Sequence, residues 1–188
     1  MKMLPKKQLY NEKVVPALKK ELGIENPMAV PRVGKIVVNI GTGKILKDAK
    51  RVEDAIISLG VITGQKVVAT RARKAIAGFK TREGLEVGAR VTLHGKRMWD
   101  FLDRLVNVAL PRVRDFQGIP RSAIDQSGNC NIGIKEHLVF PEIVAEKVQN
   151  IFSFQINIVT TAKNRQEGGV LFRLLGLPLE QVEVTREK

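Results

Sequence analysis

RARKAIAGFKTREGLEVGARVTL, residues 71–93, joins a cationic segment to a strongly alternating one. In the second half, apolar residues stand at every second position: Val87, Ala89, Val91 and Leu93. The residues between them are polar or small: Glu86, Gly88, Arg90 and Thr92. A period of two is typical of a β-strand that buries one face. We therefore predict an amphipathic strand that is preceded by a flexible cationic loop.

The loop, residues 71–84, contains one acidic residue, Glu83, and five basic residues. The basic residues are Arg71, Arg73, Lys74, Lys80 and Arg82. Small residues such as Gly78 surround its two larger apolar residues, Ile76 and Phe79. A basic loop with apolar residues at its tip is suited to reaching and contacting a polyanion. Most charge-rich loops are simply solvated, however, and the loop taken alone favours neither interpretation.

The composition is that of a folded, strongly basic protein. The chain has 188 residues, of which 44% are hydrophobic, and this suffices for one compact domain with a buried core. The formal net charge of +13 favours nucleic acid or an anionic membrane surface as partner. Cys130 is the only cysteine, which excludes an internal disulfide and a cysteine-cluster zinc site. Because no signal peptide and no apolar run of transmembrane length is found, we expect a soluble intracellular protein.

Periodicity predicts several further elements. Apolar residues recur at helical spacing in three segments: residues 6–22, 48–60 and 97–110. The first of these helices should be broken or kinked near Pro16. Alternation predicts strands at residues 35–40 and 155–161. Strands with one polar face indicate an α+β fold, an antiparallel sheet with helices packed on one face.

The remaining elements are shorter. Residues 65–70 predict a strand, and residues 131–140 predict one strand or a pair of short strands. A helix is expected from Asn164, with Glu167 at the capping-box position. Gly168-Gly169 in its first turn costs about 1 kcal/mol per glycine relative to alanine, and the sequence offers no reason for the pair.

The C-terminal end of the sequence is predicted to be separate from the fold. We expect one RNA-binding domain over residues 1–179 and a mobile tail from Pro178 onward, with residues 180–188 outside the domain.

No motif supports catalysis. The segment GTGK, residues 41–44, is followed by Ile45 where a phosphate-binding Walker loop requires Ser or Thr. His94 and His137 are isolated in the sequence, and Cys130 has no neighbouring activator. No cluster of Asp, Glu and His has the spacing of a metal site. We therefore expect no catalytic residue, no metal and no cofactor.

The polar residues of the predicted strands favour RNA. If the strands pair, Lys35, Asn39, Arg90 and Thr92 emerge on one open face, where cations suit phosphates and neutral groups suit bases or ribose hydroxyls. Aromatic residues make up only 5% of the chain, and we place none of them on this face. Folded RNA is therefore a better ligand than a single strand, which needs stacking. An ordinary solvated face is the alternative.

Four segments closely resemble the bacterial form of large-subunit ribosomal protein five, the 5S rRNA-binding family. They are KIVVNIGTGK at 35–44, ITGQKVVATRARKAIAGFKTREG at 62–84, VGARVTLHGKRMWDFLDRLVNVALPRVRDFQGI at 87–119 and GIKEHLVFPEI at 133–143. The resemblance runs in order from about residue 5 to Leu179. Gly168-Gly169 and the residues beyond Leu179 depart from the pattern of the family.

The resemblance implies an α+β fold and a place in the central protuberance of the large subunit of cytoplasmic ribosomes. The implied partners are 5S rRNA, 23S rRNA, peptidyl-site tRNA, neighbouring large-subunit proteins and a small-subunit head protein at an intersubunit bridge. Contacts to 5S rRNA carry over to Asn39, Gln65 and Thr92, to which the open face adds Lys35 and Arg90. The family's loop at the tRNA elbow matches residues 71–84, with these candidate contacts: Arg71, Arg73, Lys74, Ile76, Gly78, Phe79, Lys80 and Arg82.

Two other functions serve as alternatives. A small RNA-modifying enzyme would need a pocket around His94 or Cys130. A basic membrane-surface protein would need an exposed amphipathic helix, whereas the predicted helices are better explained as parts of the core.

Overall fold

The computed structural model describes residues 5–43, 48–79, 81–143 and 150–180. Five antiparallel strands form one sheet in the order β2-β3-β1-β5-β4. The strands are β1 (Val33–Gly41), β2 (Val68–Arg71), β3 (Glu86–Leu93), β4 (Cys130–Ile134) and β5 (Phe154–Thr160). The predicted α+β class is thereby confirmed.

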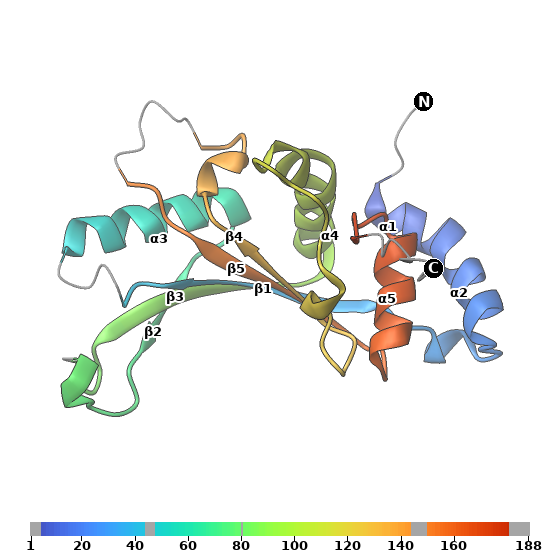
Figure 1. The fold of residues 1–188 in the computed structure, drawn as a ribbon, viewed down its shortest axis with the longest axis horizontal. Coiled ribbons are helices and arrows are strands. Elements are labelled where there is room, and N and C mark those ends of the chain that lie inside the picture. Colours follow the sequence, from blue (N-terminus) through green and yellow to red (C-terminus); the bar gives the residue numbers. More distant parts are fainter. Residues whose placement is uncertain (1–4, 44–47, 80, 144–149, 181–188) are drawn as a thin grey trace, which may run out of the picture.

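Helices accompany this sheet in the described residues: α1 (Lys6–Leu9), α2 (Val15–Leu22), α3 (Ala49–Thr63), α4 (Gly95–Arg104) and α5 (Arg165–Leu174). Figure 1 shows α3 and α4 above one side of the sheet, and α1, α2 and α5 gathered at one end of it. The hairpin of β2 and β3 projects from the opposite end. The helices predicted from periodicity are all present.

The first predicted helix is irregular near Pro16, as expected, but it is not broken there. Residues Tyr10–Val14 form a π-helical segment between α1 and α2, and Pro16 stands in the first turn of α2. A proline has no N–H to donate, and its ring clashes with the carbonyl group four residues earlier. The regular α-helical ladder therefore cannot run through Pro16, and the chain widens locally into a π-turn.

The core lies on the face of the sheet that the alternation predicted. Ile36 and Val38 of β1, Leu93 of β3 and Ile156 of β5 are completely shielded from solvent. Helix α4 contributes Phe101 to the same apolar cluster. Full burial of such a side chain stabilises the fold by about 1.5–3 kcal/mol, so the one-sided cover of the sheet follows from its apolar face.

The strand predicted at residues 131–140 is shorter than expected. β4 ends at Ile134, and residues His137–Val139 form a single turn of 3-10 helix. His137, Val139 and Phe140 are all buried, so this segment is held by packing and not by strand pairing. The apolar residues of this segment correctly predicted that it is buried, but the pattern did not distinguish a strand from a buried turn.

The structure gives a reason for Gly168. Helix α5 begins after Asn164, whose Oδ1 accepts a hydrogen bond of 2.8 Å from the N–H of Glu167. The first turn of α5 then lies directly against Gly128: a Cβ on Gly168 would stand 2.6 Å from both the Cα and the carbonyl oxygen of Gly128. Only glycine allows the helix to come this close to the loop that precedes β4.

The predicted mobile tail does not begin at Pro178. The N–H of Ile119 donates to the carbonyl oxygen of Pro178 at 2.7 Å, and the N–H of Glu180 donates to that of Ile119 at 2.9 Å. These bonds join Leu179 to Ile119 as a parallel bridge. Backbone pairing therefore extends the fold as far as Glu180, and residues 181–188 lie outside the described residues.

Candidate nucleic-acid interface

The face of the sheet opposite the core carries a row of polar residues. Strand β1 pairs with β3 on one side and with β5 on the other, so Asn39 lies between Arg90 and Gln155. Neighbouring strands are about 4.8 Å apart, which makes residues in one row direct neighbours. The register thus forms a polar row across the middle of the open face.

The next row of this face holds Thr92. Val37 of β1 lies between Thr92 of β3 and Asn157 of β5. Lys35, opposite Val159, follows along β1 on the same face and is exposed to solvent. The register therefore assembles the predicted set on one face: Lys35, Asn39, Arg90 and Thr92.

The chemistry of this set suits a folded polyanion. Lys35 and Arg90 are exposed, and their charges can meet phosphates, while Asn39 and Thr92 are half-buried and neutral. An amide both donates and accepts hydrogen bonds, as does a hydroxyl, so either can pair with a ribose hydroxyl or a base edge. The face thus combines cations that can position an RNA backbone with neutral groups that can form hydrogen bonds to it.

Strands β4 and β5 extend this surface with residues that the sequence analysis did not select. Gln155 continues the row of Asn39, and Asn131 of β4 lies opposite Asn157. The Oδ1 atom of Asn157 is buried and has no hydrogen-bond partner among the described residues. The alternation of residues 155–161 already predicted that Gln155 and Asn157 point away from the core. It did not indicate that they belong to a candidate binding surface.

Gln65 lies beside the face and not on it. It precedes β2, and its Nε2 donates a hydrogen bond of 2.9 Å to the backbone oxygen of Thr92. Its Oε1 accepts a longer bond of 3.4 Å from the guanidinium of Arg97. The structure therefore brings Gln65 next to Thr92, with both ends of its amide group hydrogen-bonded to other residues of the protein.

The segment predicted as a flexible loop is a hydrogen-bonded extension of the β2–β3 hairpin. The N–H of Ala72 donates to the carbonyl oxygen of Leu85 at 2.8 Å, so the ladder continues past the strands. Further out, Ile76 and Thr81 exchange two backbone hydrogen bonds of 3.1 and 3.2 Å. Residues Ala77–Phe79 then turn the chain as a 3-10 helix. The loop interpretation was wrong in this respect, because local backbone pairing compensates for the lack of bulky side chains.

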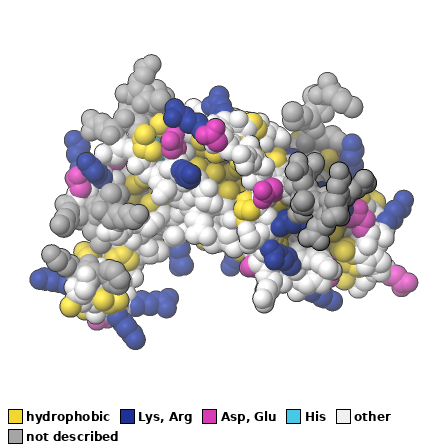
Figure 2. Space-filling view, in the orientation of Figure 1, with side chains coloured by type: hydrophobic (Ala, Val, Ile, Leu, Met, Phe, Trp, Pro, Cys, Tyr) yellow, Lys and Arg dark blue, Asp and Glu magenta, His cyan; other side chains and the backbone are white. Residues whose placement is uncertain are grey.

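The hairpin presents its cations to solvent. Arg73, Lys74 and Arg82 are exposed, and Arg71 forms an exposed ion pair of 3.6 Å with Glu86. Figure 2 shows Lys and Arg side chains projecting in several directions from the lobe at the lower left, which is the hairpin of Figure 1.

The tip of the hairpin is small and partly apolar. Ile76 is 48% exposed, and Gly78 stands in the 3-10 turn. The side chain of Phe79 and the whole of Lys80 lie outside the described residues.

The enzyme alternative finds no support around Cys130 or His94. Cys130 is fully shielded, and burial raises the pKa of its thiol to about 12, the opposite of what a nucleophile needs. His94 is exposed at the start of α4. Neither residue lines the cavity of about 600 Å³ beside α5. In the described part of the chain, no group of three His, Cys, Asp or Glu residues is placed to hold a metal ion.

No helix among the described residues is long and apolar enough to cross a lipid bilayer.

Known proteins with similar sequences identify the family of this chain. Residues 26–82 match the family model for ribosomal protein L5, and residues 86–179 match the model for the C-terminus of the ribosomal L5P family. The chain belongs to the ribosomal protein L5 family. The large ribosomal subunit protein uL5 of Rubrobacter xylanophilus is 53% identical over 92% of this chain and 96% of its own length. The uL5 protein of Herpetosiphon aurantiacus is 52% identical over 92% of this chain and 96% of its own. That of Anaeromyxobacter sp. (strain K) is 50% identical over 93% of this chain and 97% of its own.

Membership in the L5 family shows the general role of the protein. This L5 chain is a structural constituent of the large subunit of the cytoplasmic ribosome and not an enzyme. The matched regions end at Leu179, so the last nine residues lie beyond them.

Proposed function

We propose that this L5 protein binds 5S rRNA through its open sheet face and attaches it to 23S rRNA in the central protuberance. The observation that carries the proposal is the strand register, in which Asn39 neighbours Arg90 and Thr92 follows in the next row. Neutral hydrogen-bonding groups flanked by cations suit the shallow minor groove of an RNA helix, where ribose hydroxyls are displayed.

The absence of aromatic side chains from the rows of this face supports the same ligand. The residues that the register aligns there on β1, β3, β4 and β5 include Asn, Gln, Thr, Arg and Val. Single-stranded RNA is bound largely by stacking on aromatic rings, which these rows do not provide. Recognition therefore rests on shape, phosphate contacts and hydrogen bonds.

The hairpin serves a second RNA, the elbow of peptidyl-site tRNA. The hairpin extends away from the body of the fold (Figure 1), and its cations point in several directions (Figure 2). Arg71, Arg73, Lys74 and Arg82 contact phosphates, while Ile76 lies at the contact tip. The remaining partners follow from the resemblance to the family: other large-subunit proteins of the protuberance and a small-subunit head protein at an intersubunit bridge.

The proposal is tested by substitutions on the face. Asn39→Ala and Thr92→Ala should each weaken binding of purified protein to 5S rRNA by about 1–3 kcal/mol, because a polar group of the RNA loses its partner. This corresponds to roughly a 5- to 150-fold increase in Kd, measurable by fluorescence anisotropy with labelled 5S rRNA at fixed salt.

Asn11→Ala is the matched control, since Asn11 is exposed on the π-helical segment, away from the sheet. It should bind 5S rRNA as the parent does. Unchanged affinity in both Asn39→Ala and Thr92→Ala would remove the sheet face from the 5S rRNA interface.

A further inference from the structure

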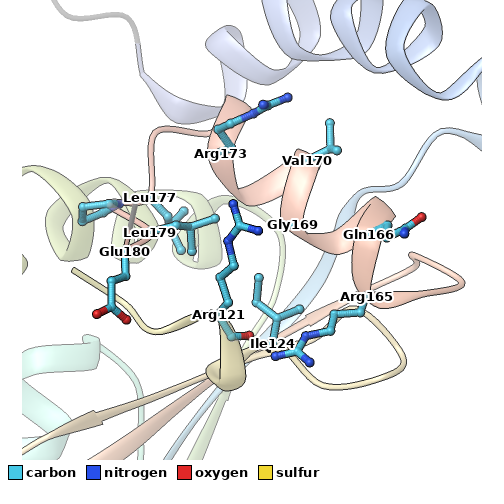
Figure 3. A pocket seen from close by; sticks show the side chains of 11 residues that line it. Arg121, Ile124, Arg165, Gln166, Gly169, Val170, Arg173, Leu177, Leu179 and Glu180 are labelled. Atoms are coloured by element: carbon cyan, nitrogen blue, oxygen red, sulfur yellow. Dashed lines mark hydrogen bonds between the residues drawn. The ribbon is translucent and has the colours of Figure 1, made fainter. Parts of the chain in front are cut away.

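The cavity of about 600 Å³ lies between α5 and the segment that runs from Arg121 to Ile124. This volume is in the range of about 300–1,000 Å³ that is usual for pockets enclosing a small ligand. Figure 3 shows Arg121 extending from that segment toward α5, with Arg165 beside Ile124. Much of the wall is apolar, formed by these side chains: Ile124, Val170, Leu177 and Leu179.

Three arginines line this cavity, and they are not equally engaged. Arg173 donates to both carboxylate oxygens of Glu21, at 2.7 and 2.9 Å. Arg165 uses one nitrogen to donate to the backbone oxygen of Arg121. The guanidinium of Arg121 has no carboxylate partner among the described residues, and Figure 3 shows the carboxylate of Glu180 directed away from it. Arg121 can therefore pair with an anionic group that enters beside the apolar wall.

Gly169 lines the same cavity from the middle of α5. Glycine is less favourable than alanine inside a helix, so the position needs a reason. A Cβ on Gly169 would meet only Cδ1 of Ile124, at 3.8 Å, and no packing contact among the described residues requires glycine there. Glycine is the usual residue where a backbone approaches a ligand closely, so a ligand in the cavity would supply the missing reason.

A nucleotide has the groups that these features suit. Its phosphate can accept the paired hydrogen bonds that a guanidinium offers, and its flat base can lie against an apolar wall or a guanidinium plane. Proteins commonly recognise RNA through bases that are unstacked and splayed out of the chain. An acidic side chain of a protein partner would pair with Arg121, but it has no flat face to lie against the backbone at Gly169. The net charge of +13 also favours RNA.

We propose that this cavity binds an unstacked nucleotide of ribosomal RNA, with the phosphate at Arg121 and Arg165 and the base against Gly169 and the apolar wall. The inference rests on the proposed function only in naming ribosomal RNA as the source of the nucleotide. None of the lining residues belongs to the polar rows of the sheet or to the β2–β3 hairpin. Figure 1 shows α5 and the hairpin at opposite ends of the sheet, so the cavity contacts a separate part of the RNA.

Nuclear magnetic resonance of the full chain, labelled with nitrogen-15, tests the site. Adenosine 5′-monophosphate should shift the backbone amide resonances of Gly169, Val170 and Leu177, which line the cavity. Inorganic phosphate lacks the base, so its affinity should be lower by about tenfold or more. An RNA hairpin with one bulged adenosine should shift these amides at a lower concentration than the mononucleotide does. The same hairpin without the bulge should leave them unchanged.

Substitutions test the two parts of the site. Arg121→Gln should weaken binding of the mononucleotide by about tenfold or more, because the phosphate loses a charged partner. Gly169→Ala should weaken it as well without lowering stability, because the added methyl group occupies space at the cavity wall.

Two matched controls should bind the mononucleotide as the parent does. Arg112→Gln removes the charge of an exposed arginine that does not line this cavity. Gly60→Ala adds a methyl group inside α3, where a Cβ would make only ordinary contacts.

Several results would overturn the proposal. Unshifted cavity amides, or equal affinity for phosphate and mononucleotide, would mean that no nucleotide is recognised. Tighter binding of the mononucleotide than of the bulged hairpin would make the ligand a free nucleotide, and tighter binding of a short peptide of leucine and glutamate would make it a protein. Unchanged binding in Arg121→Gln or Gly169→Ala would remove that residue from the site.

These titrations use neither 5S rRNA nor the sheet face. Their failure is therefore distinguishable from a failure of Asn39→Ala to weaken 5S rRNA binding, which would bear on the proposed function alone.

Discussion

Gly168 and Gly169 are neighbours in one helix, yet their surroundings assign them different roles. A side chain on Gly168 would collide with backbone atoms of Gly128, which cannot move aside as a flexible side chain can. A Cβ on Gly169 would meet only Cδ1 of Ile124, at 3.8 Å, an ordinary contact. Close packing explains the first glycine, whereas nothing in the structure requires the second.

Gly168→Ala should therefore destabilise the protein by about 1–3 kcal/mol, the usual cost of forcing extra volume into a packed site. Gly169→Ala should be neutral or stabilising by up to about 1 kcal/mol, because alanine is the better helix former. Urea denaturation of both variants measures the difference. Equal stability of the two would show that α5 does not depend on its approach to Gly128.

His137 is a fully buried ionisable residue in the 3-10 turn that follows β4. Its ring stacks on Phe152 with centroids 3.9 Å apart, and its Nδ1 accepts a bond of 3.4 Å from the N–H of Phe152. Its Nε2 is buried without a partner among the described residues. Burial lowers the pKa of His137 below the ordinary value of 6.5.

The unfolded chain consequently binds a proton on His137 at a higher pH than the folded chain does. Stability contributed by the neutral ring is complete above pH 6.5 and is lost as the pH falls through the lowered pKa. His137→Phe should remove this dependence, while costing about 1–3 kcal/mol at pH 7.5 because the N–H of Phe152 loses its acceptor. Denaturation curves at several pH values measure it, with the exposed His94→Gln as control. Parallel pH profiles of the parent and His137→Phe would contradict the assignment.

At the scale of elements, the β2–β3 hairpin depends on a close approach of its neighbours to the backbone at Gly88. A Cβ on Gly88 would lie 2.7 Å from the backbone oxygen of Ile40 and 2.8 Å from Oγ1 of Thr70, so this position requires glycine. The bonds between Ala72 and Leu85 and between Ile76 and Thr81 continue the pairing toward the tip. The cations are thus presented by a paired backbone, which reduces the entropy cost of the RNA contact proposed for the tip.

Replacing Arg73 and Lys74 together by alanine should spare 5S rRNA binding and weaken retention of peptidyl-site tRNA in reconstituted ribosomes. Exposed charged contacts contribute up to about 1 kcal/mol each, so loss of two of them should make tRNA dissociate faster by up to roughly 30-fold. Lys13→Ala with Lys20→Ala on the N-terminal helices removes the same charge elsewhere and should change neither property. Loss of 5S rRNA binding in the hairpin variant would mean that sheet and hairpin do not divide their ligands as proposed.

At the scale of the whole molecule, the net charge of +13 and the one-sided sheet act together. Covering one face with helices leaves the other to solvent, where its neutral residues alone would attract RNA weakly. In the proposed complex with 5S rRNA, the cations of the chain supply the long-range attraction and the sheet face supplies the contacts.

Binding to 5S rRNA should therefore weaken steeply with salt, since each phosphate contact releases condensed counterions. Arg90→Gln should reduce the slope of log affinity against log salt by about one phosphate contact, or roughly 0.9. Asn39→Ala should lower affinity equally at all salt concentrations and keep the slope. Titrations at several salt concentrations separate the two, and salt-independent binding of the parent would contradict a phosphate-based interface.

Much of this arrangement could be predicted from the sequence, because alternation and helical spacing are local consequences of burial. Residues 87–93 identified a half-buried strand, and the same alternation in residues 35–40 placed Lys35 and Asn39 on its polar side. The family segments identified the kind of protein. The segment around His137 was predicted incorrectly, because a buried turn and a strand share the same short apolar pattern.

Tertiary structure alone decided the rest. The extension of the polar row to Gln155 and Asn131 depends on which strands are neighbours, and the engagement of Gln65 depends on its contact with Thr92. The need for glycine at position 168 arises from a loop forty residues away in the sequence. These features are set by distances between segments that are remote along the chain, and such distances leave no periodic signal in either segment.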